Sequence, residues 1–228
     1  ELKSKRVVGT IGTGSMNDPF MPLEAKVRLT RRALEAIAEA GFPVHTITKS
    51  DLVLRDLDLF AAIQAKSYAA VTFTVTTADD ALGKKLEPGA PVSSRRLAAL
   101  RTLRAAGILS GVTLMPVLPF IEDTEENIRR IVERSAEAGA AYILPAFGMT
   151  LRDRQRAYYY NKLDLHFPGL RGRYEKAFGE RYSARAQNAK RLEQVFDELC
   201  AKHGIAKRMP VFPPQKRIRQ PENQPSLF

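Results

Sequence analysis

Cysteine is nearly absent from this sequence, which contains one cysteine among its 228 residues. A single cysteine can form neither an internal disulfide framework nor a cysteine-rich metal site. Because stable disulfides belong to oxidising compartments, this scarcity favours a reducing, cytoplasmic location. The three histidines, His45, His166 and His203, lack the spacing of metal ligands, and structural roles are the simpler interpretation for all three.

Long apolar runs are also lacking. No stretch reaches the roughly 20 residues of a membrane span, and the sequence does not open with a signal-peptide pattern, so we expect no membrane association. The hydrophobic content of 44% suits one medium-sized globular domain.

Positively charged residues are in excess. The sequence has 36 Lys and Arg residues against 25 Asp and Glu residues, which gives a net charge of +11. This excess favours anionic partners such as nucleic acid, phosphorylated substrates or anionic cofactors, and a solvated basic face without a ligand is the alternative.

The first two thirds of the sequence alternate between β-rich and helical runs. Strands are predicted at residues 6–12, 43–49, 69–77, 109–119 and 140–148, and helices at residues 23–41, 54–64, 92–107 and 122–139, with a short helix opened by Asp79 and Asp80. The first of these helices places Val27, Leu34, Ile37 and Ala38 on one face. Ser93 or Ser94 and Asp123 or Thr124 are the predicted helix caps. This succession predicts a parallel sheet or barrel with helices outside.

The pattern changes after Met149. Two basic amphipathic helices, residues 151–167 and 185–204, follow with no predicted strand between them, and a basic, Pro-rich end then reads as an extended tail. We therefore divide the sequence into residues 1–149, a helical extension over residues 150–206, and a tail over residues 207–228. The last helix has an apolar stripe formed by Leu192, Val195, Phe196, Leu199 and Cys200. Its cysteine is therefore predicted to lie in the core and not to act as a ligand or nucleophile.

Residues with binding chemistry lie where the predicted strands end, which is where parallel α/β folds bind ligands. The segment GTGSMNDPF, residues 12–20, is either an ordinary strand-to-helix turn or the lip of such a site. Asp18 in this segment can hold an ammonium group, and Lys49 can hold a carboxylate or phosphate. Threonines at the next strand end can meet ribose hydroxyls, although threonine is also a favourable strand residue. This set suits a small zwitterion that carries a sugar and a flat base.

Several blocks, in this order, resemble one family. They are GTGSMNDPFMPLE, ITKSDLVLRDLDL, TVTTADD followed by LEPGAP, LMPVLPFIEDTEENI and the terminal PENQPSLF. Together they are similar to radical S-adenosylmethionine (radical SAM) proteins related to spore photoproduct lyase, the DNA repair photolyase-like subgroup. The resemblance implies a partial (β/α)6 TIM-type barrel. It also implies an enzyme in which a [4Fe–4S] cluster, reduced by an external electron donor, cleaves S-adenosylmethionine to a 5′-deoxyadenosyl radical.

The resemblance also implies a cofactor site. By position, the loop of Ser15, Met16, Asn17 and Asp18 receives the amino group of the cofactor, and Lys49 faces its carboxylate. Thr74 and Thr76 match the strand that contacts the ribose. Leu114, Met115 and Val117 match the strand that lines the adenine. On this basis the segment at residues 12–20 is interpreted as the lip of a cofactor site.

The sequence departs from the family in one respect. In the family, three cysteines of a CxxxCxxC loop after the first strand coordinate the cluster. This sequence has no candidate for that loop or for that strand. The resemblance therefore implies a barrel that lacks its first strand and its cluster-binding segment, and a chain that is inactive by itself. The lyase also uses a cysteine to return hydrogen, and Cys200 matches no such position. The substrate is left open, with nucleic acid among the candidates.

Two other functions remain open. One is a non-catalytic barrel that binds nucleic acid through the basic C-terminal region. The other is an aldolase-like barrel in which Lys49 forms a Schiff base with the substrate.

Overall fold

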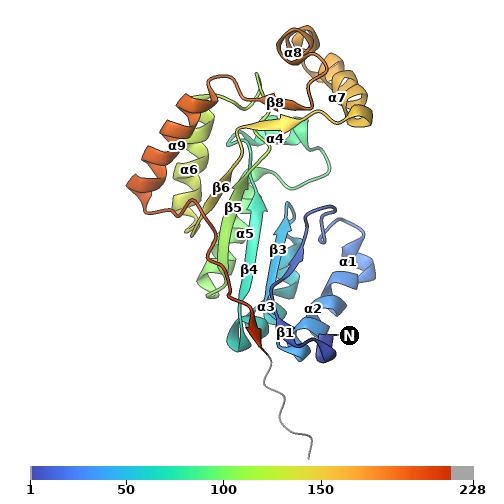
Figure 1. Cartoon of the computed structure of the whole chain (residues 1–228), viewed down its shortest axis with the longest axis vertical. Helices are drawn as coiled ribbons and strands as arrows, with labels where there is room; N and C mark the ends of the chain where they lie inside the picture. The colour runs from blue at the N-terminus through green and yellow to red at the C-terminus, as the bar shows by residue number, and fades with distance from the viewer. Residues whose placement is uncertain (1, 217–228) are drawn as a thin grey trace, which may run out of the picture.

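A parallel five-stranded sheet forms the centre of the molecule in a computed structural model that describes residues 2–216 (Figure 1). Its strands are β2 (Ile11–Thr13), β3 (Val44–Thr48), β4 (Ala69–Thr74), β5 (Leu109–Leu114) and β6 (Ile143–Pro145), and they lie in this order across the sheet. Every neighbouring pair is parallel. The predicted α/β class with a parallel sheet is therefore confirmed.

Helices connect the successive strands. They are α1 (Glu24–Val27), α2 (Leu29–Ala40), η2 (Asp51–Asp56, a 3-10 helix), α3 (Leu57–Lys66), α4 (Asp80–Leu86), α5 (Ser93–Ala105) and α6 (Glu125–Glu137). The side chain of Asp79 accepts hydrogen bonds at the start of α4, and Thr124 does so at the start of α6. Both residues satisfy backbone N–H groups that a helix start leaves without partners. Within residues 2–216, no helix combines the length and the apolar character that crossing a membrane requires.

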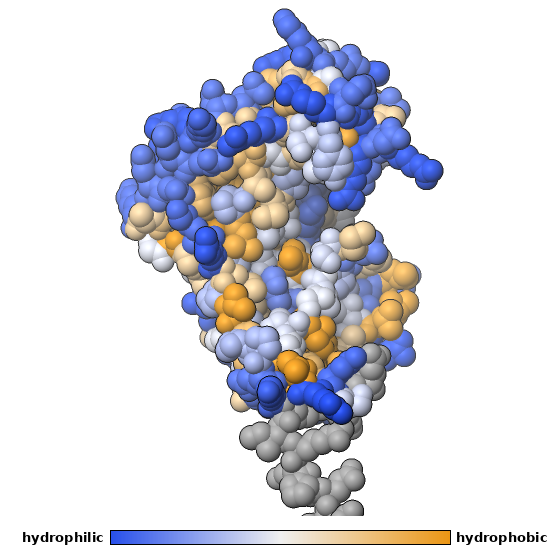
Figure 2. All heavy atoms as spheres, in the orientation of Figure 1, coloured by the Kyte–Doolittle hydropathy of each residue, from blue (hydrophilic) through white to orange (hydrophobic). Residues whose placement is uncertain are grey.

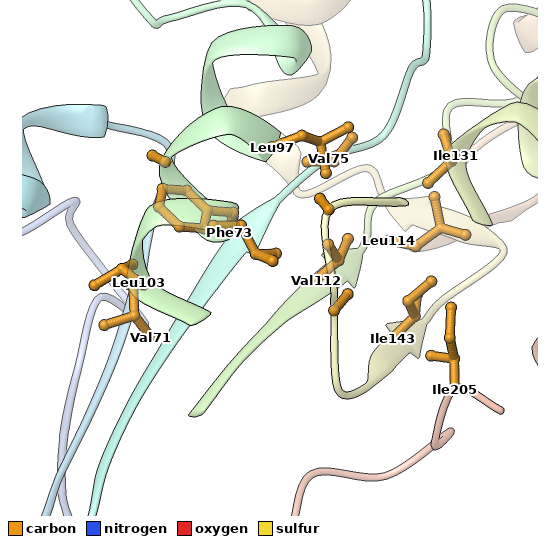
Figure 3. Close-up of a cluster of buried hydrophobic side chains, with 14 of the residues drawn as sticks. Val71, Phe73, Val75, Leu97, Leu103, Val112, Leu114, Ile131, Ile143 and Ile205 are labelled. Carbon is orange, nitrogen blue, oxygen red and sulfur yellow. The ribbon is translucent and has the colours of Figure 1, made fainter. Parts of the chain in front are cut away.

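The two faces of the sheet differ in chemistry. Side chains alternate along a strand, so Val71 and Phe73 of β4 and Val112 of β5 lie on one face, packed in the main hydrophobic core with the helices (Figure 3). The opposite face is polar. There His45 Nε2 lies 2.7 Å from Thr72 Oγ1, which lies 2.6 Å from Tyr142 Oη, and the hydroxyls of Thr74 and Thr113 are 3.0 Å apart. Burial lowers the pKa of His45 and so favours its neutral form.

The prediction of one continuous helix over residues 23–41 is wrong. Arg28 has a left-handed backbone, with φ of 52°, and it separates α1 from α2. The Glu24 carboxylate accepts hydrogen bonds from the backbone N–H groups of Leu29 and Arg31 and thus caps α2 from within the chain. Val27 is consequently exposed, while the other three residues of the predicted face, Leu34, Ile37 and Ala38, are buried as expected.

The prediction that Ser93 or Ser94 caps the next helix is also wrong. Val92 occupies the cap position of α5 and makes no side-chain cap hydrogen bond. Ser94 instead uses its backbone N–H and its hydroxyl to bind the carboxylate of Asp80. The serine therefore joins the start of α5 to the start of α4.

The C-terminal region contains a strand that the sequence did not reveal. In the described part of the chain, three helices follow Met149, namely α7 (Asp153–His166), α8 (Leu170–Phe178) and α9 (Ala189–His203). Strand β8 (Ser183–Arg185) lies between α8 and α9 and pairs antiparallel with β7 (Gly148–Thr150). The expectation of two helices without an intervening strand is therefore wrong. This α7–α8 unit has its own small core, formed by Leu151, Tyr160, Leu163, Leu170, Tyr174, Phe178 and Ala184.

The last helix belongs to the main core. Figure 1 shows α9 beside α6, and the predicted stripe from Leu192 to Cys200 is buried. Beyond it, Ala206 bridges to Tyr142, and the Tyr68 hydroxyl donates to the carbonyl of Pro210 at 2.8 Å. Strand β9 (Gln215–Lys216) then pairs antiparallel with β1 (Val7–Val8). The first part of the predicted tail thus runs across the amino ends of the strands, whereas residues 217–228, with PENQPSLF, lie outside the described residues.

Candidate functional site

A cavity of about 280 Å³ opens at the carboxyl ends of the central strands. Lys49 follows β3, Thr76 follows β4 and Pro116 follows β5, and all three line it. The loop after α4 supplies a second wall and α7 supplies a third. Figure 2 shows the surface indented below the α7–α8 unit, whose visible surface is mostly hydrophilic. Ligand sites of open parallel sheets form at this edge.

An ion-pair chain runs along one wall of the cavity. Lys49 Nζ lies 2.5 Å from Glu87 Oε1, and Arg96 Nη2 donates to Glu87 Oε2 at 2.6 Å. Arg96 is only 3% exposed, and it also donates to the carbonyls of Pro91 and Thr74. Burial alone would raise the pKa of Glu87, but the charges of Lys49 and Arg96 outweigh it and lower that pKa. These ion pairs therefore fix the position of the Lys49 side chain at the end of β3.

A buried carboxyl group forms another part of the cavity wall. Glu122 is 1% exposed, and its two oxygens accept hydrogen bonds from the Thr76 hydroxyl at 2.7 Å and the Leu118 backbone N–H at 3.0 Å. Burial raises the pKa of Glu122 to about 7, and these hydrogen bonds only partly offset the rise. Burial thus favours the protonated form of Glu122.

Asp18 acts as a latch between two loops. One of its carboxylate oxygens accepts from the Phe20 backbone N–H at 2.9 Å and from the Thr48 hydroxyl at 2.7 Å, and the other accepts from the Lys49 backbone N–H at 2.7 Å. These bonds hold the segment after β2 against the end of β3. The sequence did not reveal this structural use of Asp18, and its predicted contact with an amino group stays a prediction.

A separate network of ion pairs joins the α1–α2 connection to η2. Asp56, fully buried, accepts from Arg31 Nη1 at 2.9 Å and from Arg55 Nε at 2.8 Å. Arg55 also donates to the Glu24 carboxylate at 2.9 Å. These pairs between buried carboxylates and partly exposed arginines hold the α1–α2 connection against the segment after β3.

The other predicted site residues have varied surroundings. Ser15, Met16 and Asn17 are exposed in the loop after β2 and do not line the cavity. Leu114 and Val117 are fully buried, and Met115 is 37% exposed. Thr74 is bound to Thr113 within the sheet. Of the predicted set, Lys49 and Thr76 line the cavity.

Sequence reasoning missed Glu87, Arg96 and Glu122. Two of them lie inside quoted family blocks, LEPGAP and LMPVLPFIEDTEENI, but neither ends a strand. Their pairing needs contacts between residues separated by 9 to 46 positions. No local signal marks these residues, because each lies among other polar or charged residues in the sequence.

The residues of this chain do not fit an iron–sulfur cluster. Such a cluster is held by several thiolates, and the sequence has a single cysteine. Cys200 is buried in α9, and burial raises the pKa of its thiol to about 11. Within the described residues, no group of three or more His, Cys, Asp and Glu side chains is placed to hold a metal ion. S-adenosylmethionine is compatible with the residues present, because a lysine and a threonine, Lys49 and Thr76, line one cavity after adjacent strands.

The fold is similar to that of spore photoproduct lyase. A solved structure of that enzyme with bound AdoMet and dinucleoside spore photoproduct matches with a TM-score of 0.58 and 17% identity, over 86% of this chain and 58% of that one. A structure of Streptococcus suis SuiB bound to the precursor peptide SuiA matches with a TM-score of 0.50 and 11% identity, over 86% of this chain and 36% of that one. No protein-family model matches the chain.

Curated proteins also match this sequence, and one of them is named as a radical SAM enzyme. An uncharacterized protein of Mycobacterium tuberculosis is 28% identical over 219 residues, which are 96% of this chain and 64% of that protein. The radical SAM Nalpha-GlyT isomerase of Pseudomonas phage M6 is 29% identical over 133 residues, 58% of this chain and 27% of that protein. The chain thus spans less than two thirds of the length of these relatives. The resemblance that the sequence motifs predicted, to radical SAM proteins of the spore photoproduct lyase type, is confirmed.

Proposed function

We propose that this chain is the core of a radical SAM enzyme that binds S-adenosylmethionine at the carboxyl ends of its central strands. The observation that carries the proposal is the cavity itself, because residues after three successive strands, Lys49, Thr76 and Pro116, line one space. The likeness to spore photoproduct lyase supports it. The Nζ of Lys49 is paired with Glu87, whereas a Schiff-base lysine must present a free amine, so the geometry favours this function over an aldolase.

The chain's own residues have distinct parts in this proposal. Lys49 binds the carboxylate of the cofactor, and the loop of residues 15–18 lies toward its amino group. Thr76 faces the ribose from the cavity wall, and Pro116 lines the cavity within the segment of residues 114–117 that is proposed to lie beside the adenine. Thr74 keeps its proposed place beside the ribose, although it does not line the cavity. When bound and reduced through an external electron donor, the cofactor supplies hydrogen-abstraction chemistry. The reaction type and the substrate stay open in this proposal, with a lyase-like reaction as the expectation.

The cluster ligands are proposed to lie outside these 228 residues, on a segment that completes the barrel. Among the described strands, β2 pairs with β3 on one side only, so its other edge can accept a further parallel strand. Large apolar side chains are exposed in the segment that follows this edge, namely Met16, Met21, Leu23, Val27 and Leu29. In this proposal the chain is a partial barrel without its first strand and is inactive by itself. Stoichiometric iron and sulfide in the anaerobically purified chain would contradict this assignment.

Nucleic acid is the proposed macromolecular partner, through the basic C-terminal region. The α7–α8 unit adjoins the cavity and carries exposed arginines, among them Arg152 and Arg154. Phosphate contacts of this kind give affinity that falls steeply with salt. Replacing both arginines with alanine should reduce the affinity for single-stranded DNA and its salt dependence, and unchanged values would favour a solvated basic face. We also propose a reducing, cytoplasmic compartment, on the basis of the single cysteine.

The proposal is tested by calorimetric binding of S-adenosylmethionine to the chain and to Lys49→Ala. Loss of a hydrogen bond to a charged group costs roughly 1.5–3 kcal/mol, so the affinity should fall about ten- to hundredfold. Lys84→Ala is the matched control, because Lys84 is exposed and does not line the cavity. Equal affinity in the wild type and Lys49→Ala would refute the role of Lys49.

A further inference from the structure

Cations outnumber carboxylates on the walls of the cavity. Lys49, Lys85, Arg96 and Lys162 line it, and only Glu87 and Glu122 oppose them among its lining residues. Burial raises the pKa of Glu122 to about 7 and so favours its protonated form. Glu87 has a lowered pKa and therefore stays ionised. Glu87 is thus the main negative charge on these walls.

Two of the cations have no carboxylate partner among the described residues. Lys85 Nζ lies 4.2 Å from the ring centroid of Phe167, and Lys162 Nζ lies 5.5 Å from that of Tyr158. Such cation–π contacts leave the charge of a lysine available to anions. Without Glu87, a cavity with these walls would attract any phosphate-bearing ligand of suitable size.

Arg96 fixes the position of the Glu87 carboxylate. Arg96 donates to Glu87 Oε2 at 2.6 Å, to the carbonyl of Pro91 at 2.7 Å and to the carbonyl of Thr74 at 2.8 Å. The guanidinium is therefore held by the end of β4 and the loop before α5. Because Arg96 is buried and charged, it keeps the Glu87 carboxylate beside the Lys49 ammonium.

We infer that Glu87 determines the charge specificity of this cavity by disfavouring phosphate groups at Lys49. The inference rests on the proposed function, because the ligand that it admits is S-adenosylmethionine. Adenine nucleotides share the adenosine part of that cofactor but carry phosphates in place of the zwitterionic methionine end. A polyphosphate that reached Lys49 would lie next to the Glu87 carboxylate, and juxtaposed like charges are a recognised means of rejecting a wrong ligand. S-adenosylmethionine has a single carboxylate, whose charge is offset by its own ammonium and sulfonium groups, so Glu87 repels it less than a polyphosphate.

The test compares the affinities of S-adenosylmethionine and ATP by calorimetry in the absence of divalent cations. Glu87→Gln keeps an oxygen that accepts from Arg96 but removes the charge, and it should shift the ratio of the two affinities toward ATP by about tenfold or more. Glu87→Asp retains the charge and should keep most of the preference for S-adenosylmethionine. Glu126→Gln, at an exposed position on α6, controls for the change in net charge. Melting temperatures of all four proteins report on folding.

The outcomes separate the inference from the proposed function. A wild-type preference for S-adenosylmethionine that is reduced in Glu87→Gln, and not in Glu126→Gln, supports the inference. The same preference left unchanged in folded Glu87→Gln overturns the inference but leaves the proposed function standing. Wild-type protein that binds ATP as well as S-adenosylmethionine also overturns it. Wild-type protein that binds no S-adenosylmethionine overturns both.

Discussion

Two groups of charged side chains lie close to the strand ends, and they differ in one respect. The network of Glu24, Arg31, Arg55 and Asp56 is closed, because its carboxylates have their donors within the chain and none of the four residues lines the cavity. The group of Lys49, Glu87, Arg96 and Glu122 has its pairs on one side and a cavity on the other. Closed networks fix loop geometry, whereas a charge that borders a cavity is available to a ligand. The difference separates structural residues from candidate ligand contacts better than charge or sequence motif does.

Breaking the closed network should have the largest effect on stability. Asp56→Asn removes a fully buried charge that Arg31 and Arg55 share, and loss of one partner of a buried pair costs about 3–5 kcal/mol. Chemical denaturation should show this loss in the free energy of unfolding. Asp58→Asn is the control, since exposed Asp58 pairs with the same Arg31 at 2.8 Å and should cost no more than about 1 kcal/mol. Equal losses in the two variants would contradict the distinction.

In the group that borders the cavity, Glu122 should make the stability of the protein depend on pH. The folded-state pKa of Glu122, about 7, lies above the ordinary value of 4.5. The stability that Glu122 contributes is therefore fully present below about pH 4.5 and is lost as the pH rises through 7, by roughly 3 kcal/mol in total. Glu122→Gln should remove this part of the pH dependence, so that the variant gains stability relative to the wild type between pH 5 and pH 8. Parallel stability curves for the two proteins would show that Glu122 titrates normally.

Replacing Asp18, which belongs to neither group, should cause a smaller loss of stability. Asp18→Asn keeps one accepting oxygen and turns an amide toward one of the three donors, which should cost about 1–3 kcal/mol of stability. A cycle with Thr48→Val tests the latch directly, because residues that share a hydrogen bond give non-additive losses. Strict additivity would mean that the contact carries no stability. A further loss of S-adenosylmethionine affinity in Asp18→Asn, larger than the loss in Thr48→Val, would support the proposed contact with the amino group.

Much of the fold could be predicted from local sequence. The β-rich runs gave the five parallel strands, and the apolar stripes of α2 and α9 gave their buried faces, because period and burial are coupled within one element. The break at Arg28 could not be predicted this way. It depends on Glu24, which caps α2 and pairs with Arg55, a residue 31 positions away. The strand β8 was missed because three residues of ordinary composition form a strand only where β7 offers a partner.

The sequence by itself determined the class of the fold, the family resemblance and the position of Lys49 and Thr76 at strand ends. These features follow from residue order, since the end of a strand is fixed by the strand's own pattern. Only the tertiary structure decided which charges meet. Glu87 reaches Lys49 because Arg96, on the next helix, is buried against the carbonyl of Thr74, and Glu122 becomes a carboxyl group with a raised pKa because folding removes it from water. Contacts between distant residues and the loss of solvent around them are properties of the folded chain, and no local pattern encodes them.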